Sequence, residues 1–234
     1  MSVRVAVLAS GSGTNLQAIF DYFDALGPRA GASVTLVASD RVSAGALDRA
    51  RARDIAGVHL DADHRGDAMV ELLEGHHTEI VALAGYLRFV PPAVTRRWHG
   101  RVLNVHPSLL PAFGGAGMYG TRVHQAVLDA GVRVTGVTVH FVDEEYDRGP
   151  IIAQWPVPVL PHDTPESLAR RVLAVEHVLF PRAVRAVALG RVTLGADGRV
   201  SGVGEHLAGC AAYALSGAEV APDVSVLFPG ARAP

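Results

Sequence analysis

The sequence predicts an α/β protein built on a mostly parallel, twisted sheet with helices on both faces. Short runs of Val, Ile, Leu and Ala alternate with segments whose apolar residues recur at helical spacing, and this alternation is typical of βαβ units. The runs are apolar at nearly every position, as in parallel strands that are buried on both faces. Two longer runs on either side of a polar segment near residue 145 predict some antiparallel strand pairing in the C-terminal half.

The first half of the chain is predicted to alternate strands with helices. Residues 3–8 form an apolar strand, and residues 15–26 form a helix that ends at Gly27. The apolar residues that give this helix its periodicity are Leu16, Ile19, Phe20 and Phe23. The same reasoning predicts strands over 34–38, 57–60, 80–84 and 102–105, and helices over 44–53, over 67–74 and from Pro91–Pro92.

The second half is predicted to hold two long strands and a long helix. The strands cover residues 132–142 and 150–159, and the acidic segment 143–149 connects them. The helix begins at Pro165 with Thr164 as its cap. One face of that helix is apolar, with Leu168, Val172, Val175 and Leu179.

We expect one domain over residues 1–195, whose last short strand starts at Gly190, followed by a tail over 196–234. The tail is rich in Gly, Ala and Ser and holds three prolines. A segment of this composition has few large apolar side chains to bury, so we expect it to be loosely packed or partly disordered.

Composition and charge narrow the classes of function. The chain of 234 residues is 49% hydrophobic and 19% charged, as in compact globular proteins. Its net charge of -2 gives no reason to expect nucleic acid or a membrane as a partner. Cys210 is the only cysteine, which excludes an internal disulfide and a cysteine-rich metal site. The sequence shows no secretory signal and no apolar run long enough to span a bilayer, so we expect a cytoplasmic protein.

A glycine-rich turn joins the first strand to the first helix. Its glycines let the backbone approach an anion, and the helix N-terminus supplies free N–H groups. The turn Ser10–Asn15, with side-chain donors at Thr14 and Asn15, therefore predicts a phosphate site, which we favour over a simple tight turn. A dinucleotide site stays open as an alternative, although Leu16 replaces the third glycine of that pattern.

Three side chains that can carry chemistry stand where buried strands should end. Asn104 and His106 share one face of an extended strand, and Pro107 restricts His106 to that geometry. Asp147 follows in the acidic connection. An amide with an imidazole can stabilise an oxyanion, and an imidazole with a carboxylate can move a proton. A purely structural His106 and a solvated loop around Asp147 are the alternatives.

The other histidines carry weaker predictions. His140 shares a strand face with Thr138 and could reach the same cleft, but we favour a core histidine with satisfied hydrogen bonds. We interpret most of the rest, including His124, as surface groups, because no pair has the spacing of metal ligands. Pro111 is a candidate for a cis peptide bond.

Five segments form an ordered set of motifs across roughly residues 3–195. They read ASGSGTNLQA at 9–18, LAGYLR at 83–88, LNVHPSLLP at 103–111, TGVTVHF at 135–141 and DRGPII at 147–152, and Glu176–His177 follows in the long helix. Each motif alone is modest, but the ordered set is specific. It resembles the folate-dependent formyltransferases, in particular those that act on glycinamide ribonucleotide in purine synthesis.

The resemblance implies a Rossmann-like catalytic domain over 1–195 that moves a formyl group from 10-formyltetrahydrofolate, a co-substrate, to the amine of glycinamide ribonucleotide. It implies that Asn104, His106 and Asp147 are the catalytic trio. The resemblance further implies that the substrate phosphate is held by Gly13, Thr14 and Asn15. It assigns the ribose or amine part to Glu176, and it implies a folate pocket formed by Tyr86, Leu87, Arg88, Val90, Asn104, Val142 and Glu144.

In the implied reaction, the amine attacks the formyl carbon while Asn104 and His106 donate hydrogen bonds to the formyl oxygen. Asp147 is expected to raise the pKa of His106 and to help move the proton from the amine to the folate nitrogen. We expect no metal and no covalent enzyme intermediate. The expected partners are small molecules, with no nucleic acid or membrane, and the chain is expected to be a monomer or homodimer.

Two segments depart from the family pattern. The stretch 112–120 is longer than in many members, and Leu173 stands where some members carry a polar or basic residue. Within the family, a methionyl-tRNA formyltransferase and a formyltetrahydrofolate hydrolase are the alternatives, although each normally carries an added domain. Outside the family, a noncatalytic nucleotide-binding module and a nucleotide-dependent oxidoreductase remain as alternatives.

Overall fold

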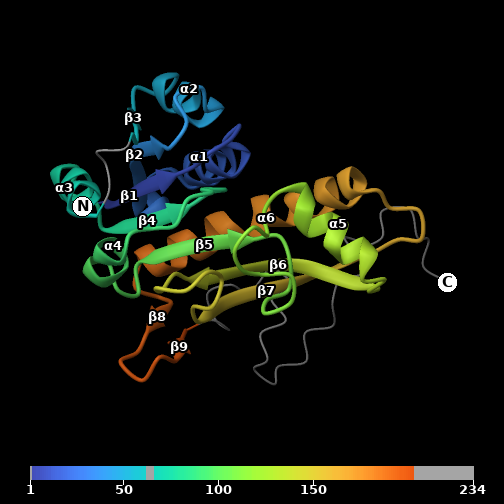
Figure 1. The fold of residues 1–234 in the computed structure, drawn as a ribbon. Coiled ribbons are helices and arrows are strands. Elements are labelled where there is room, and N and C mark those ends of the chain that lie inside the picture. The colour runs from blue at the N-terminus through green and yellow to red at the C-terminus, as the bar shows by residue number, and fades with distance from the viewer. Residues whose placement is uncertain (1, 62–65, 203–234) are drawn as a thin grey trace.

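Seven strands form one sheet in the order β3–β2–β1–β4–β5–β6–β7 (Figure 1). Strands β1 to β5 are parallel, whereas β6 pairs antiparallel with both β5 and β7. The predicted class and the antiparallel pairing in the C-terminal half are therefore confirmed. The computed structural model describes residues 2–61 and 66–202. The strand bounds are β1 Val3–Leu8, β2 Ala32–Ser39, β3 Ala56–His59, β4 Ile80–Leu83, β5 Val102–His106, β6 Val134–Phe141 and β7 Ile151–Pro158.

Helices cover both faces of the sheet, as predicted. Alternate residues of β1 point to opposite faces, so that Val5 and Val7 join one apolar cluster while Ala6 and Leu8 join another. Helices α1, α2 and α6 contribute to the first cluster, and α3 and α4 contribute to the second. The helix bounds are α1 Thr14–Leu26, the short 3-10 helix η1 Gly27–Ala30, α2 Gly45–Arg51, α3 Asp67–Gly75, α4 Pro92–Arg97, α5 Thr121–Asp129 and α6 Pro165–Ala188.

The strand order reverses beside β1, which lies between β2 and β4. In open α/β sheets the crevice at the carboxyl ends of strands next to such a reversal is where ligands bind. Leu83 of β4 is in register with Asn104 of β5, and the antiparallel pairing of β5 with β6 places His140 opposite Asn104. The sheet therefore brings the polar ends of β5 and β6 to this crevice.

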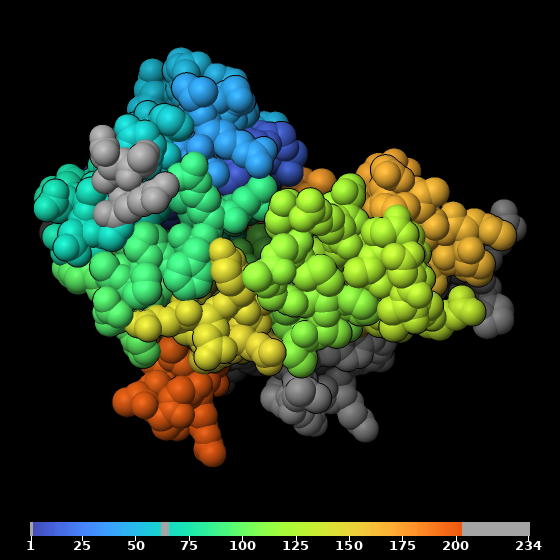
Figure 2. Space-filling view, viewed as in Figure 1, coloured from blue at the N-terminus to red at the C-terminus, as the bar shows by residue number. Residues whose placement is uncertain are grey.

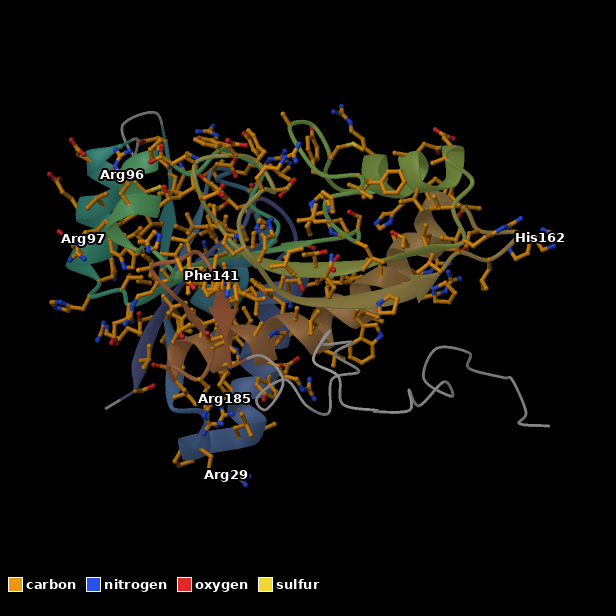
Figure 3. The ribbon with its side chains drawn as sticks, turned by 90° about the horizontal axis from the view of Figure 1, so that it is seen from below. Arg29, Arg96, Arg97, Phe141, His162 and Arg185 are labelled. Carbon is orange, nitrogen blue, oxygen red and sulfur yellow. The ribbon has the colours of Figure 1, made fainter. Side chains whose placement is uncertain are left out.

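Helix α6 spans much of the sheet (Figure 1). Side-chain hydrogen bonds anchor both of its ends. Thr164 and Ser167 form a capping box at its start, and Arg171 donates two hydrogen bonds to Asp163, each at 2.8 Å. Near its end, Arg185 donates to the backbone carbonyls of η1 (Figure 3). These contacts fix the helix that carries Glu176.

Some elements differ from the prediction. Helix α5 was not anticipated, because a glycine-rich segment precedes it and only three of its residues, Val123, His124 and Val127, are buried. The short strand that we expected from Gly190 starts at Thr193, since Gly190 has a φ of 66° and belongs to the turn after α6, and an unpredicted short strand follows at Val200–Ser201.

Strand β8 (Thr193–Leu194) pairs with β9 (Val200–Ser201) in a separate small sheet. The expected tail thus begins at the turn of this hairpin, and its residues 203–234 lie outside the described part. The Leu110–Pro111 peptide bond is cis, as anticipated. Over residues 2–61 and 66–202, no helix is both long and apolar enough to span a bilayer.

Candidate active site

The three predicted side chains meet at the carboxyl end of β5. Leu103 and Val105 of β5 point into the first apolar cluster. Because side chains alternate along a strand, Asn104 and His106 project from the opposite face of β5. Asp147 enters from the β6–β7 connection: its Oδ2 lies 3.5 Å from Nδ1 of His106, and its Oδ1 lies 3.4 Å from Nδ2 of Asn104. Residues more than forty positions apart therefore share one small polar cluster.

The β6–β7 connection adopts an unusual backbone conformation to present Asp147. The φ of Asp147 is 53°, in the left-handed region that few side chains other than Asn and Asp tolerate. Two residues later, a Cβ at Gly149 would collide with the carbonyl oxygen of Phe141. Only glycine fits at this point, where the connection passes close to the end of β6. The resulting turn directs the Asp147 carboxylate toward β5.

His140 is a fourth member of the cluster, although we expected a core histidine outside the site. Its Nε2 lies 3.1 Å from Nδ2 of Asn104 and 3.6 Å from Oδ1 of Asp147. Its Nδ1 lies 2.8 Å from the carbonyl oxygen of Phe141 and must donate to it. With the hydrogen on Nδ1, Nε2 of His140 is placed to accept from the Asn104 amide. The shared face with Thr138, combined with antiparallel pairing onto β5, was the signal that could have identified it.

The protonation of His106 differs from the expectation. Burial is the largest influence and lowers the pKa of His106, and His140 adds to this, whereas Asp147 and the Phe113 carbonyl oppose it. The expected rise caused by Asp147 is thus outweighed by desolvation of a side chain that is only 4% exposed. Nε2 donates to the carbonyl oxygen of Phe113 at 2.9 Å, so neutral His106 presents an unprotonated Nδ1 to Asp147.

Asp147 is held in its ionised form. Burial is the largest influence and would raise its pKa, but the nearby His140 and His106 side chains and the backbone N–H of Gly115 together lower the pKa. The Gly115 N–H donates to Oδ2 at 2.9 Å. The segment 112–120, which departs from the family pattern, therefore supplies one hydrogen bond to the central carboxylate and, through Phe113, one to His106.

His124 is buried, contrary to the expectation of a surface group. It is 4% exposed on α5 and lines the same cavity, and its Nδ1 has no hydrogen-bond partner among the described residues. Burial, followed by the nearby His106, lowers the pKa of His124. The surface interpretation failed because it had no helix at 121–129 that could turn this side chain inward.

The cluster lies in a cavity of about 450 Å³. In Figure 2 the molecule is hollowed where the segments after β4 (green), before α5 (lime) and between β6 and β7 (yellow) meet. Of the expected folate and ribose residues, those that line it are Tyr86, Leu87, Arg88, Val90, Asn104, Val142 and Glu176. Glu144 is not among the lining residues: its Oε1 accepts a hydrogen bond from Arg96 of α4 at 2.9 Å.

A partly buried hydrogen-bond network supports the segment after β4. The Ser10 hydroxyl donates to Oδ1 of Asp40 at 2.5 Å and accepts from the backbone N–H of Leu87 at 2.9 Å. Oδ2 of Asp40 lies 3.2 Å from Nε of Arg88. Burial and, secondarily, Asp40 raise the pKa of Tyr86 to about 12. The loop after β1 and the segment after β4 are therefore joined behind the cavity wall.

The three predicted phosphate residues are not equivalent. Gly13 is buried with a φ of 74°, and a Cβ there would lie 2.8 Å from Cα of Ala46. Thr14 lines a separate shallow hollow together with Arg49. Asn15 lines the main cavity, where its Nδ2 donates to Oε2 of Glu176 at 2.6 Å.

Glu176 is the acidic group at this end of the cavity. Burial raises its pKa, and the hydrogen bond from Asn15 only partly offsets this. A carboxyl group with a raised pKa can carry a proton that a substrate amine or hydroxyl could share. Glu176 and the trio line the same cavity.

Comparisons with known proteins show which sequences and structures this chain resembles. A family model described as formyl transferase matches residues 3–184. The chain is 43% identical over 208 residues to the trifunctional purine biosynthetic protein adenosine-3 of Bos taurus, with 86% of the chain and 20% of that protein covered. It thus spans about a fifth of the length of that relative.

Two further relatives match over most of their length. The chloroplastic phosphoribosylglycinamide formyltransferase of Arabidopsis thaliana is 38% identical over 202 residues, which cover 83% of the chain and 68% of that protein. The crystal structure of glycinamide ribonucleotide transformylase 1 from Symbiobacterium toebii matches with a TM-score of 0.77 at 42% identity, covering 85% of the chain and 93% of that structure.

Proposed function

The chain belongs to the formyl transferase family, and from this premise we propose that it transfers the formyl group of 10-formyltetrahydrofolate to the amine of glycinamide ribonucleotide, a step of purine biosynthesis. The observation that carries the proposal is the convergence of Asn104, His106 and Asp147 in one cavity. An amide donor, an imidazole and an ionised carboxylate are what acyl transfer to an amine requires.

The Asn104 amide is the proposed donor to the formyl oxygen. As the amine nitrogen bonds to the formyl carbon, negative charge grows on that oxygen, and one aligned donor stabilises it by about 3 kcal/mol. In the free enzyme Nδ2 faces His140 at 3.1 Å and Asp147 at 3.4 Å. The contact to Asp147 is the longer of the two, so breaking it when substrate enters costs less free energy than breaking the contact to His140.

His106 and Asp147 are the proposed proton carriers. The amine loses a proton as the bond between the formyl carbon and the folate nitrogen breaks, and that nitrogen gains one. Neutral His106 keeps its Nε2 hydrogen on Phe113 and accepts the amine proton at Nδ1. The Asp147 carboxylate, 3.5 Å away, stabilises the imidazolium that forms, and the imidazolium then returns the proton to the leaving nitrogen.

The other end of the cavity is the proposed site of the ribonucleotide. Gly13, Thr14 and Asn15 begin α1, whose first-turn N–H groups lack partners within the helix and favour a phosphate. Glu176 beside Asn15 is positioned for the ribose or the amine. Binding the phosphate at a distance from the reacting amine would orient that amine toward the trio.

The segment Tyr86–Val90 and Val142 are the proposed wall for the formyl donor, and the Ser10–Asp40 network fixes that segment from behind. Glu144, paired with Arg96 at the rim, is proposed to contact the donor only through its backbone or after this pair opens. A metal-free reaction, a monomeric or homodimeric state and a cytoplasmic location stay predictions.

The direct test mixes the purified chain with 10-formyltetrahydrofolate and glycinamide ribonucleotide and follows deformylation spectroscopically. We expect deformylation and formylated ribonucleotide in equal amounts, with no turnover when the ribonucleotide is omitted. Deformylation at an equal rate without the ribonucleotide would instead identify water as the acceptor. An absence of any deformylation would contradict the proposed function.

A further inference from the structure

One of the two arginines that line the cavity has its charge available for a ligand. These arginines are Arg88 and Arg170. Nε of Arg88 lies 3.2 Å from Oδ2 of Asp40, so the charge of Arg88 is already paired. Arg170 is exposed, and within the part of the chain that the structure describes its guanidinium forms no hydrogen bond and no ion pair. Its charge can therefore serve an anionic ligand.

Arg170 shares a helix face with Glu176. Helix α6 packs against α1 and α5 (Figure 1), and Arg170, Leu173 and Glu176 line the cavity at intervals of three residues along α6. From Arg170 to Glu176 the helix rises about 9 Å. The side chain of Leu173 has no polar atom, and the methylene groups of an arginine can lie along such an apolar surface. The guanidinium can thus extend toward the region between α6 and the start of α1.

The other ionisable groups of the cavity do not favour an anion. The carboxyl groups that line it belong to Asp143, Glu145, Asp147 and Glu176. Burial lowers the pKa of His106 and that of His124, so neither ring is charged at pH 7. An anion that enters the cavity therefore depends on an arginine for its opposite charge.

The phosphate of the proposed acceptor is such an anion. A phosphate monoester carries a charge of about -1.5 to -2 at pH 7. The start of α1 offers N–H groups and the equivalent of only about half a positive charge. Backbone groups alone therefore leave most of the phosphate charge unbalanced. A guanidinium suits this task, because its N–H groups can donate two parallel hydrogen bonds to phosphate oxygens.

We propose that Arg170 binds the phosphate of the acceptor from the side of α6, while the N–H groups of α1 bind it from the other side, and that Arg170 determines the preference for a phosphorylated acceptor. This inference rests on the proposed function and adds a side chain to the expected phosphate residues Gly13, Thr14 and Asn15. The phosphate is remote from the reacting amine, so the ion pair is the same before and during the reaction. Its loss should therefore raise KM and leave kcat nearly unchanged.

A charge that stabilises the helix is the competing explanation. Glu166 precedes Arg170 by four residues, the spacing at which opposite charges on a helix attract. This attraction is small: the pKa of Glu166 is lowered mainly by its own backbone N–H and by Thr164, and Arg170 lowers it least. If the pair with Glu166 were the role of Arg170, loss of either partner would lower the melting temperature alike and leave the KM of the ribonucleotide unchanged.

The test compares Arg170→Gln, Arg170→Lys and Glu166→Gln with the parent in steady-state kinetics. We expect Arg170→Gln to raise the KM of the ribonucleotide about 10- to 30-fold, as for a lost hydrogen bond to a charged group at an exposed position. The values of kcat and of the donor KM should stay within about 2-fold. Arg170→Lys keeps the charge and should restore most of the affinity, and Glu166→Gln should match the parent. Arg182→Gln is the matched control, because Arg182 lies on the same helix outside the main cavity and donates to the carbonyl of Val178.

Two further measurements identify the phosphate as the partner of Arg170. With an acceptor that lacks the phosphate, kcat/KM should agree within about 2-fold between Arg170→Gln and the parent. Salt screens an ion pair at an exposed position. Higher ionic strength should therefore raise the KM of the ribonucleotide more in the parent than in Arg170→Gln.

Equal ribonucleotide KM values in Arg170→Gln and the parent would overturn the inference, and so would an equal loss with the acceptor that lacks the phosphate. Calorimetric binding of the ribonucleotide separates the inference from the proposed function. A parent that transfers no formyl group but binds the ribonucleotide more tightly than Arg170→Gln contradicts the proposed function and supports the role of Arg170. An active parent that binds it no more tightly than Arg170→Gln contradicts the role of Arg170 alone. Thermal melting shows whether each variant is folded.

Discussion

The hydrogen bonds around Asn104, His106, His140 and Asp147 fix which ring nitrogen of each histidine carries its hydrogen. His140 donates from Nδ1 to Phe141, which leaves Nε2 to accept from Asn104. His106 donates from Nε2 to Phe113, which leaves Nδ1 facing the ionised Asp147. The cluster therefore has one favourable position for an additional proton, between His106 and Asp147, and that is where the proposed reaction needs it.

Glu176 allows a pH-dependent prediction. Because burial raises its pKa, the folded protein keeps a proton that the unfolded chain has already lost at pH values just above the ordinary carboxyl pKa. The folded state binds more protons in that range, so stability falls as the pH rises through it. Glu176→Gln removes the ionisation and keeps an oxygen that can accept from Asn15.

We therefore expect the free energy of unfolding of Glu176→Gln, relative to the parent, to increase as the pH rises from 4 to 8. Urea unfolding over that range measures it, and Glu71→Gln at an exposed position of α3 is the control for the substitution itself. A stability difference that is independent of pH, or that decreases as the pH rises, would show that burial does not disfavour the Glu176 carboxylate.

At the scale of elements, the loop between β1 and α1 is shaped by helix α2. The carbonyl of Gly11 accepts from the N–H of Ala46 at 3.2 Å, and the carbonyl of Ser12 accepts from Nε of Arg49 at 2.8 Å. With these carbonyls bound to α2, the N–H groups at the start of α1 are left for an anion. Gly13 passes so close to Ala46 that a Cβ there would lie 2.8 Å from the Ala46 Cα.

Gly13→Ala should disrupt the phosphate site. The new Cβ would lie 2.8 Å from Cα of Ala46 at a φ of 74°, so the loop must move away from α2. We expect the KM of the ribonucleotide to rise about 10- to 100-fold, as for lost hydrogen bonds to a charged group, with a smaller effect on kcat. Steady-state kinetics measure both values.

The matched control for this loop is Gly11→Ala. A Cβ at Gly11 meets nothing within 4 Å among the described residues, so the KM of the ribonucleotide should stay within about 2-fold of the parent value. Equal KM values for the two variants would remove the loop from the phosphate site. An analogue of the acceptor without its phosphate should not distinguish the variants.

The elements themselves differ in how well the sequence predicts them. Strand β4 is uniformly apolar and β1 is apolar except at Arg4, and their bounds match or nearly match the prediction. Helix α5 was missed because most of its residues are polar and glycines precede it, so the sequence lacks a clear helical pattern. Such a helix depends on tertiary packing for its stability. The burial of His124 was missed for the same reason.

At the scale of the whole molecule, the sheet topology creates the site. The reversal of strand order beside β1 opens a crevice, and the antiparallel return of β6 and β7 carries His140 and Asp147 to its edge. Sequence patterns could predict that Asn104, His106 and Asp147 stand at strand ends. They could not predict that His140 on β6 lies opposite Asn104 on the adjacent strand β5, because register is set by strand pairing, which no local pattern encodes.

The pKa of His106 illustrates a second limit of sequence reasoning. A neighbouring carboxylate was expected to raise it, but the side chain is buried by residues from β5, the segment 112–120 and α5, and desolvation outweighs the carboxylate. Only the assembled molecule determines how much water each group loses.

The measurement that tests the central claim most directly compares kcat for Asp147→Asn with that for the parent, at saturating concentrations of both substrates. Asp129→Asn, at an exposed position of α5, is the control. If Asp147 stabilises the proton on His106, kcat should fall at least about 100-fold, while the KM values of both substrates stay within a few-fold and the control retains full turnover. A kcat within about 3-fold of the parent value would contradict the assignment of Asn104, His106 and Asp147 as the centre that performs formyl transfer.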